Sequence, residues 1–185
     1  MPSNSLEETH ADDDLPADVV ALVGVRQYEE ESEFPVECGY IWTTCASVQN
    51  GNPLYWNEDV AREITGGRTA PLTMLSVWLR AHYWAPGREP GEQLPLQVHF
   101  DLKRRLRLPE AIMTDDVLTF YEPVRVGDRL NACQILRSIS EPKTTKLGRG
   151  RFWKIDVEYR NQRGELVGVD SITGLGYRRE DGGQP

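Results

Sequence analysis

The sequence has few of the residues that build metal or redox sites. Its 185 residues include only three cysteines and three histidines. The cysteines, Cys38, Cys45 and Cys133, are scattered, and neither a Cys-x-x-Cys pair nor a Cys/His spacing typical of zinc occurs. We therefore expect no metal site and reduced thiols, which suit a cytoplasmic protein. So few histidines also limit the general acid–base chemistry that is available.

Long apolar runs and excess positive charge are missing as well. No stretch approaches the ~18 apolar residues that a membrane-spanning helix needs, and residues 1–18 lack the basic start and apolar run of a secretory signal. The formal net charge of -8 argues against nucleic acid as the main partner. We expect a soluble, cytoplasmic protein, in which a local basic patch is still compatible with an anionic ligand.

The apolar content is sufficient for one packed domain. Hydrophobic residues make up 39% of the chain, and its length fits one domain or two very small ones. Residues 1–18 form an acidic stretch with little to bury, so we predict a disordered tail there. A single domain is expected over residues 19–178, and a second disordered tail over residues 179–185.

Helix signals fall in the first half of the chain. Apolar spacing predicts short helices at residues 39–48 and 98–108, the second with basic residues on its outer side. Asn57 is a suitable N-cap for a helix at residues 58–64. The most apolar segment, residues 72–85, follows Pro71 and precedes Pro86-Gly87. Because it is apolar on nearly every side, we predict a buried central helix wrapped by other structure.

Strand signals fill the second half. The period changes to two near Asp115, and strands are predicted at residues 115–122, 129–139, 152–159 and 166–177. Consecutive antiparallel strands of this kind favour a four-strand meander. A curved antiparallel sheet around one buried helix is an α+β layout.

Two turns lie just before the apolar segment. Asn50-Gly51 and Asn52-Pro53 are successive turn signals, and the pair Gly66-Gly67 stands shortly before Pro71. The backbone N–H groups at the start of a following helix are suited to bind an oxygen that carries negative charge.

These motifs, in this order, resemble those of the MaoC-like dehydratases, also called the (R)-specific enoyl-CoA hydratase family. The similarity is greatest to the N-terminal, FAS1-like half of double hot-dog dehydratases. It rests on Asn52-Pro53-Leu54-Tyr55, Ala61-Arg62, Gly66-Gly67-Arg68-Thr69-Ala70-Pro71, and the segments 120–128, 143–150 and 159–167. Several motifs in order are stronger evidence than any one of them. The resemblance implies a hot-dog fold, in which a curved antiparallel sheet wraps a central helix.

The resemblance also implies a chemistry, from which this chain departs. The family adds water across a trans-2-enoyl thioester with an Asp and a His in the pattern Gly-Asp-x-Asn-Pro-Leu-His. Asn50 stands where that Asp belongs and Tyr55 where the His belongs. Asparagine does not titrate, and a phenol with a pKa near ~10 stays protonated at neutral pH. No catalytic pair is therefore intact.

In double hot-dog enzymes one half shapes the acyl tunnel and the other supplies Asp and His. By that resemblance we expect a hot-dog dimer, either a homodimer or a heterodimer with a catalytic MaoC-like chain. The expected substrate-binding residues are Asn52, Tyr55, Ala70, Pro71 and Leu72, with a backbone N–H near Ala70 to Leu72 holding the thioester carbonyl. The substrate is a thioester of coenzyme A or acyl carrier protein, with no further cofactor.

Several residues allow two interpretations. Asn50 and Asn52 are turn formers first and ligand contacts second. Tyr55 either lines the tunnel or is simply half-buried. A histidine within the apolar segment, His82, is expected to be a core residue, whereas His99 is expected at the surface.

For the phosphates of coenzyme A we favour Lys143, Lys146, Arg149 and Arg151 over a rival cluster at Lys103, Arg104, Arg105 and Arg107, although either set can be a solvated surface.

Three functions follow. The first is a substrate-shaping subunit of an enoyl-CoA hydratase or 3-hydroxyacyl dehydratase in fatty acid or lipid metabolism. The second is a self-sufficient enzyme, either a hydratase that uses Asp59 or Glu63 or a thioesterase. The third is a non-catalytic module that binds acyl-CoA.

Overall fold

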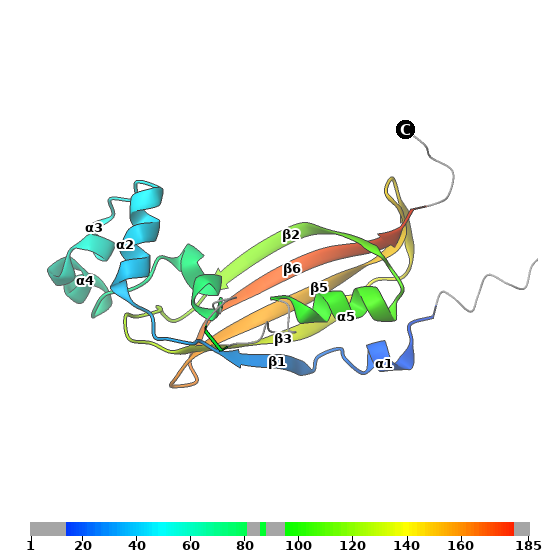
Figure 1. Cartoon of the computed structure of the whole chain (residues 1–185), viewed down its shortest axis with the longest axis horizontal. Helices are drawn as coiled ribbons and strands as arrows, with labels where there is room; N and C mark the ends of the chain where they lie inside the picture. The colour runs from blue at the N-terminus through cyan, green and yellow to red at the C-terminus, as the bar shows by residue number, and fades with distance from the viewer. Residues whose placement is uncertain (1–13, 81–85, 88–94, 180–185) are drawn as a thin grey trace, which may run out of the picture.

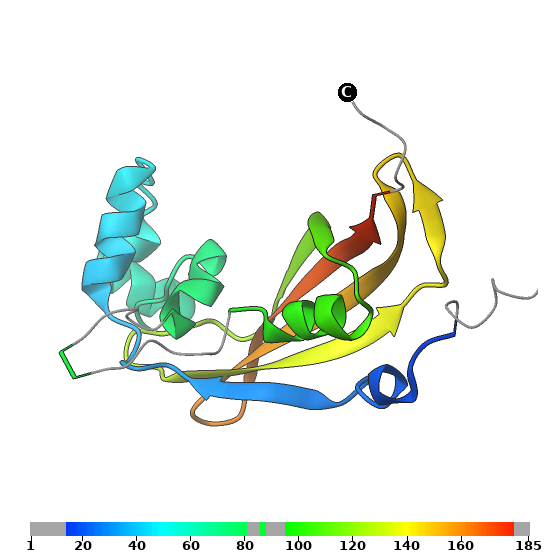
Figure 2. The same ribbon diagram turned by 45° about the vertical axis from the view of Figure 1, so that its right-hand side comes forward.

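The computed structural model describes residues 14–80, 86–87 and 95–179. In these ranges an antiparallel sheet curves around a helix, and a group of shorter helices lies at one end of the sheet (Figures 1 and 2). The strands are β1 (Arg26–Glu31), β2 (Glu110–Phe120), β3 (Leu130–Ile139), β4 (Lys143–Thr145), β5 (Gly148–Asn161) and β6 (Leu166–Arg178). The helices are α1 (Ala17–Val20), α2 (Cys38–Ser47), α3 (Pro53–Trp56), α4 (Glu58–Thr65), the 3-10 helix η1 (Leu72–Leu79) and α5 (Gln97–Arg105).

The predicted strands all form, but the predicted meander is wrong. The strand order is β1-β3-β5-β6-β2, with β4 paired to β5, so β2 lies beside β6 and not beside β3. The connection from β2 to β3 does not form a hairpin, because its backbone binds the segment before η1. The Ala70 N–H donates to the Val124 carbonyl and the Val126 N–H to the Arg68 carbonyl, at 2.8 and 3.0 Å. These bonds carry the chain across the end of the sheet to the opposite side.

The helix in the hollow of the sheet is α5, not residues 72–85 (Figure 2). The helix predicted at residues 98–108 is therefore confirmed, although its place in the fold is the one expected for the apolar segment. Its side chains Val98 and Leu102 are fully buried and pack against Leu136 and Ile155 of the sheet. Its basic residues occupy the last turn, where positive charge opposes the helix dipole.

The apolar segment begins as the 3-10 helix η1, which corrects the predicted central helix. Met74, Leu75 and Trp78 are buried, but Leu72 is 51% exposed, and Arg80 already has an extended backbone. An all-round apolar pattern cannot distinguish a long wrapped helix from short turns that bury one side, and the β-branched Thr73 and Val77 disfavour an α-helix. Residues 81–85, including His82, lie outside the described residues. So do residues 1–13 of the predicted acidic tail, whereas Ala17 and Asp18 belong to α1.

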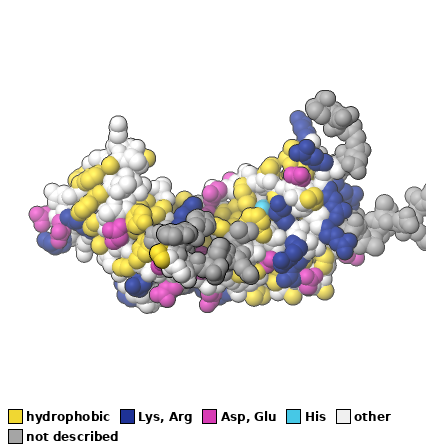
Figure 3. Space-filling view, viewed as in Figure 1, with side chains coloured by type: hydrophobic (Ala, Val, Ile, Leu, Met, Phe, Trp, Pro, Cys, Tyr) yellow, Lys and Arg dark blue, Asp and Glu magenta, His cyan; other side chains and the backbone are white. Residues whose placement is uncertain are grey.

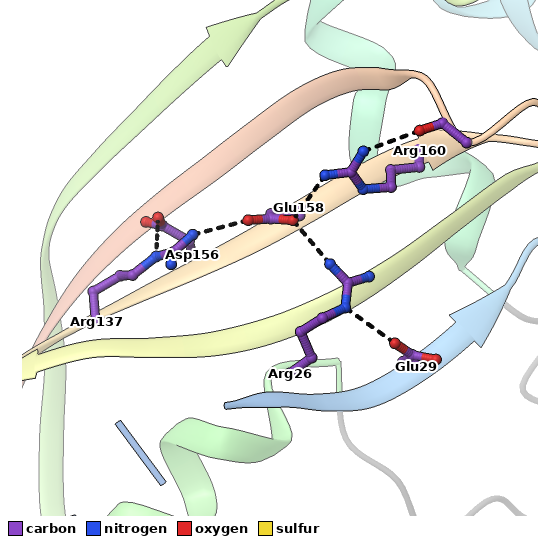
Figure 4. A network of polar contacts seen from close by, with 7 residues as sticks. Arg26, Glu29, Arg137, Asp156, Glu158 and Arg160 are labelled. Atoms are coloured by element: carbon purple, nitrogen blue, oxygen red, sulfur yellow. Dashed lines mark hydrogen bonds and ion pairs between the residues drawn. The ribbon is translucent and has the colours of Figure 1, made fainter. Parts of the chain in front are cut away.

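The outer face of the sheet carries alternating charges. Arg26, Arg137 and Arg160 surround Glu158, with Asp156 and Glu29 completing the network (Figure 4). The opposite face of β5 carries Trp153, Ile155, Val157 and Tyr159, all buried. Because successive side chains of a strand point to opposite faces, the buried residues lie on the concave face, which holds the core, and the charged residues lie on the convex face, which meets solvent.

Trp153 is the side chain on which α5 rests. It is 1% exposed, and its indole Nε1 donates to Nδ1 of His99 at 3.2 Å. His99 is therefore buried, and the prediction that it lies at the surface is wrong; burial, followed by the nearby Lys103, lowers its pKa. The indole lies over Gly174 and Gly176 of β6, where any side chain would collide with it.

We predict that Gly176→Ala strongly destabilises the fold. A Cβ at Gly176 would overlap the six-membered ring of Trp153, and overpacking of this kind costs about 1–3 kcal/mol or more. Chemical denaturation should show the loss as a lower midpoint. Gly51→Ala is the matched control, since a Cβ at Gly51 meets no atom within 4 Å. Equal midpoints for the two variants would contradict the proposed packing.

Candidate active site and the arginine cavity

The Asn50 turn is built by its own asparagine side chains. Oδ1 of Asn50 accepts from the Asn52 N–H at 3.1 Å, and Oδ1 of Asn52 accepts from the Leu54 N–H at 3.0 Å, which caps α3. The Asn50 carbonyl accepts from the Trp56 indole at 2.8 Å. Both side chains therefore form the turn, as predicted for their first role.

Tyr55 follows this turn on α3 and is partly buried. It packs against a core cluster that contains Cys45, Ala70 and Met74. Burial, followed by Cys45, raises the pKa of the Tyr55 phenol above its ordinary value. The phenol is therefore protonated at neutral pH, and it can donate a hydrogen bond but cannot accept a proton from water.

The segment before η1 offers few free backbone donors. The Ala70 N–H is used by the Val124 carbonyl, and Pro71 has no N–H. Three residues, Ala70, Pro71 and Leu72, are expected to hold a thioester carbonyl. Because Ala70 already uses its N–H and Pro71 has none, Leu72 is the remaining candidate donor. Ala70 and Tyr55 belong to the same apolar cluster, so these two predicted substrate-binding residues do lie in one region.

Asp59 and Glu63, the carboxylates expected as alternative catalytic groups, face solvent. Asn57 caps α4 as predicted, with Oδ1 accepting from the Asp59 N–H at 2.9 Å. The Asp59 side chain is 91% exposed and pairs with Arg62, and Glu63 is also exposed. Neither residue has the buried setting that tunes a general base.

The predicted phosphate-binding residues lie at the other end of the sheet. Lys143 is on β4, and Arg149 and Arg151 begin β5, whereas the Asn50 turn lies beyond the opposite ends of the long strands (Figure 1). From Arg149 to Asn161 an extended strand covers about 40 Å at about 3.3 Å per residue. Within one chain, the acyl-site residues and these basic residues do not form one pocket.

A cavity of about 400 Å³ joins parts of the two rival basic clusters. We call it the arginine cavity. Five arginines line it, together with Asp14, Pro16, Leu106, Leu108, Pro142 and Gly150; they are Arg105, Arg107, Arg149, Arg151 and Arg178. Lysine and arginine side chains gather visibly at this end of the molecule (Figure 3). A smaller cavity of about 160 Å³ lies beside η1, lined by Phe34, Tyr40, Val77, Trp78 and Arg80. The Asn50 turn lines neither cavity.

The structure also contains a pair of carboxyl groups that sequence reasoning missed. Asp170 of β6 aligns with Val157 on the concave face, and Asp116 of β2 aligns with Ile172, the next residue on that face. Oδ1 of Asp170 is buried without a hydrogen-bond partner. Burial, followed by Asp116 and then Asp156, raises the pKa of Asp170 to about 7. The sequence signal that could have indicated this carboxyl group is the position of Asp170, two residues from both Gly168 and Ile172 on the inward side of a strand.

We predict that Asp170 makes the stability of the protein fall as the pH rises. Its folded pKa is above its unfolded one, so its contribution is fully present below about pH 4 and is lost as the pH rises through about 7. Asp170→Asn removes this pH dependence. The melting temperature of the variant minus that of the wild type should therefore increase from pH 5 to pH 8. Asp116→Asn should reduce the pH dependence without abolishing it. Parallel pH profiles for wild type and Asp170→Asn would contradict this prediction.

Comparison with known proteins identifies the family. The family described as FAS1-like, dehydratase domain region, matches residues 21–169. The chain belongs to this family. A probable enoyl-CoA hydratase alpha subunit from Thermomonospora curvata is 30% identical over 146 residues, which are 78% of this chain and 46% of that protein. The chain thus spans about half the length of this relative.

Solved structures agree on the fold. A chain of the ChsH1-ChsH2 complex from Mycobacterium tuberculosis aligns with a TM-score of 0.70 at 22% identity, covering 91% of this chain and 93% of that one. A MaoC-like dehydratase from Rhodospirillum rubrum aligns with a TM-score of 0.54 at 20% identity, covering 85% and 94%. The α+β hot-dog fold is therefore confirmed. Among the described residues, none of the helices combines the length and apolar character that crossing a bilayer requires.

Proposed function

We propose that this FAS1-like dehydratase chain is a site-shaping subunit of a hetero-oligomeric enoyl-CoA hydratase or 3-hydroxyacyl dehydratase. The observation that carries the proposal is the turn that the Asn50 and Asn52 side chains build, with Asn50 and Tyr55 at the two positions where the resemblance places the family's Asp and His. The Asn50 side chain accepts a hydrogen bond from the Asn52 N–H, and the Tyr55 phenol remains protonated. A general base contributes typically ~10²–10⁴-fold to rate, and in this proposal a partner chain supplies it.

In such a complex this chain would form one wall of the acyl site. Tyr55 and Ala70 would contact the acyl group through the apolar cluster that they share, with Asn52 and Pro71 setting the backbone around them. The Leu72 N–H is our candidate donor to the thioester carbonyl. The partner chain would supply the Asp and His. The names of two similar proteins, an alpha subunit and a two-protein complex, are consistent with a subunit role.

The two edges of the sheet differ, and this difference supports association through β2. The β1 edge carries Glu29, Glu30 and Glu31 together with an irregular register, which are features that block strand addition. The β2 strand is longer and exposes apolar side chains, with Met113 50% and Val117 48% exposed. We infer that β2 pairs with the partner's edge strand to make one continuous sheet.

We predict that Met113→Glu weakens association of the chain with itself or with a catalytic hot-dog partner by about tenfold or more, because a charge would replace an apolar contact in the interface. Sedimentation equilibrium measures the effect. Ile64→Glu is the matched control, since it adds the same charge at an exposed apolar residue on α4, away from the sheet edges. If both variants associate like the wild type, β2 is not the interface.

Antiparallel pairing of two such edges would also bear on the thioester carrier. β2 runs from Glu110, opposite Tyr177, to Phe120, opposite Gly168. An antiparallel partner strand would bring the arginine end of one chain beside the Asn50 end of the other. Lys143, Lys146, Arg149 and Arg151 would then bind the phosphates of a coenzyme A thioester held in the partner's acyl site. This arrangement would overcome the separation of these residues within one chain.

A second function, self-sufficient hydration, now rests on a different residue. Asp59 and Glu63 are exposed, but Asp170 on the concave face has a pKa that suits proton exchange at neutral pH. Turnover by the isolated chain that disappears in Asp170→Asn would favour this function over the first.

We predict that the purified chain alone does not hydrate a trans-2-enoyl-CoA above the uncatalysed rate. Mixing it with a hot-dog chain that carries Gly-Asp-x-Asn-Pro-x-His should produce activity, followed by the loss of enoyl absorbance. In that complex Tyr55→Phe should keep kcat within about twofold and change mainly KM, because the hydroxyl does not move the proton. Robust turnover by the isolated wild-type chain would overturn the subunit function.

If the chain binds acyl-CoA with the same affinity alone and in the mixture, and the mixture remains inactive, the third function is favoured. Isothermal titration calorimetry with a saturated acyl-CoA separates this non-catalytic binding module from a subunit that needs its partner.

A further inference from the structure

Two neighbouring carboxylates lie in the middle of the β2 edge. Asp115 is the central residue of Glu110–Phe120, and Asp116 follows it. Both are exposed, and neither forms an ion pair with any residue in the part of the chain that the structure describes. Because successive side chains of a strand point to opposite faces, Asp115 lies on the convex side and Asp116 on the concave side. A strand added at this edge therefore meets a negative charge on both faces.

A third carboxyl group, that of Asp170, lies beside this edge on the neighbouring strand. Asp170 is on the concave face of β6, directly opposite Leu118 of β2. Its Oδ1 is buried without a hydrogen-bond partner. An unpaired buried oxygen costs free energy that a hydrogen-bond donor would recover. The concave side of the edge thus presents acceptor oxygens that need a donor.

A second copy of the chain is a poor match for this edge. No Lys or Arg occurs among residues 110–120, so a second β2 strand offers no cation in any register. Antiparallel pairing about the central residue places Asp115 opposite its own copy, with Cβ atoms about 4.5–5.5 Å apart, and like charges so placed are destabilising. The β1 edge of a second copy presents the glutamates at residues 29–31, and its one cation, Arg26, is already paired with two glutamates.

We propose that the β2 edge selects a different chain, one whose edge strand carries lysine or arginine opposite Asp115 and Asp116, and rejects a second copy of this one. The inference rests on the proposed association through β2 and specifies the chemistry of the partner. A cation at those positions neutralises both carboxylates as they lose water, and it brings a donor to the unpaired oxygen of Asp170. The exposed Met113 and Val117 supply apolar contact area, and the charges determine which chain binds.

The test supplies a basic edge on a chain of the same shape. Asp115→Lys/Asp116→Lys replaces the two carboxylates by ammonium groups, and the full-length variant is mixed with the wild type. Analytical ultracentrifugation measures association at about 0.05 M and about 0.5 M salt. At low salt the mixed pair should associate at least about tenfold more tightly than the wild type does with itself, and most of this gain should disappear at high salt.

Asp59→Lys/Glu63→Lys is the matched control. It makes the same change of charge at two exposed carboxylates of α4, away from the sheet edges. Its mixture with the wild type should associate less than about threefold more tightly than the wild type alone. Thermal melts check that each variant is folded; if the double β2 variant is not, Asp115→Lys is compared with Glu63→Lys.

Three results would overturn the inference: no gain in the mixed pair, wild-type dimers as tight as the mixed pair, or an equal gain with the α4 control. None of these measurements depends on catalysis. An inactive mixture with a catalytic hot-dog chain would count against the proposed function and leave the partner preference of β2 unchanged.

Discussion

The contact between Trp153 and two glycines sets the distance between α5 and the sheet. Gly174 and Gly176 leave the surface of β6 bare, the indole lies on it, and His99 accepts the indole N–H from above. With the helix held there, its last turn and the residues that follow reach the beginning of β5 and the end of β6. The arginine cavity exists because of this placement: Arg105 and Arg107 come from the helix side, and Arg149, Arg151 and Arg178 come from the strands.

Sequence reasoning succeeded where one local signal fixed the outcome. Asn57 caps its helix, and the alternation of residues 152–159 gives a strand with one buried face. Reasoning failed where a long-range contact decided. The bond from the Ala70 N–H to the Val124 carbonyl redirects the chain after β2, and no local pattern announces it. His99 was misplaced for a similar reason, since its partner Trp153 is distant in the sequence.

The candidate site was predicted in part. The residue types at positions 50 and 55 could be read directly, and so could the turn-forming use of the asparagines. Two basic clusters were treated as rivals because they are separate in the sequence, and only the packing of α5 shows that each contributes to one cavity. Asp170 could not be recognised from the sequence, because a single charged residue in a strand interrupts the alternation of apolar and polar residues without showing which side chains face it across the sheet.

The unequal edges of the sheet also limit how far the protein can grow by strand addition. Acidic side chains line β1, whereas β2 is the longer of these two edge strands and exposes apolar side chains. In the proposed association through β2, one chain adds one partner at that edge, and the resulting assembly is closed and finite. A chain with two such edges could add strands at both, and a run of charged side chains such as the glutamates at residues 29–31 is a feature that disfavours strand addition.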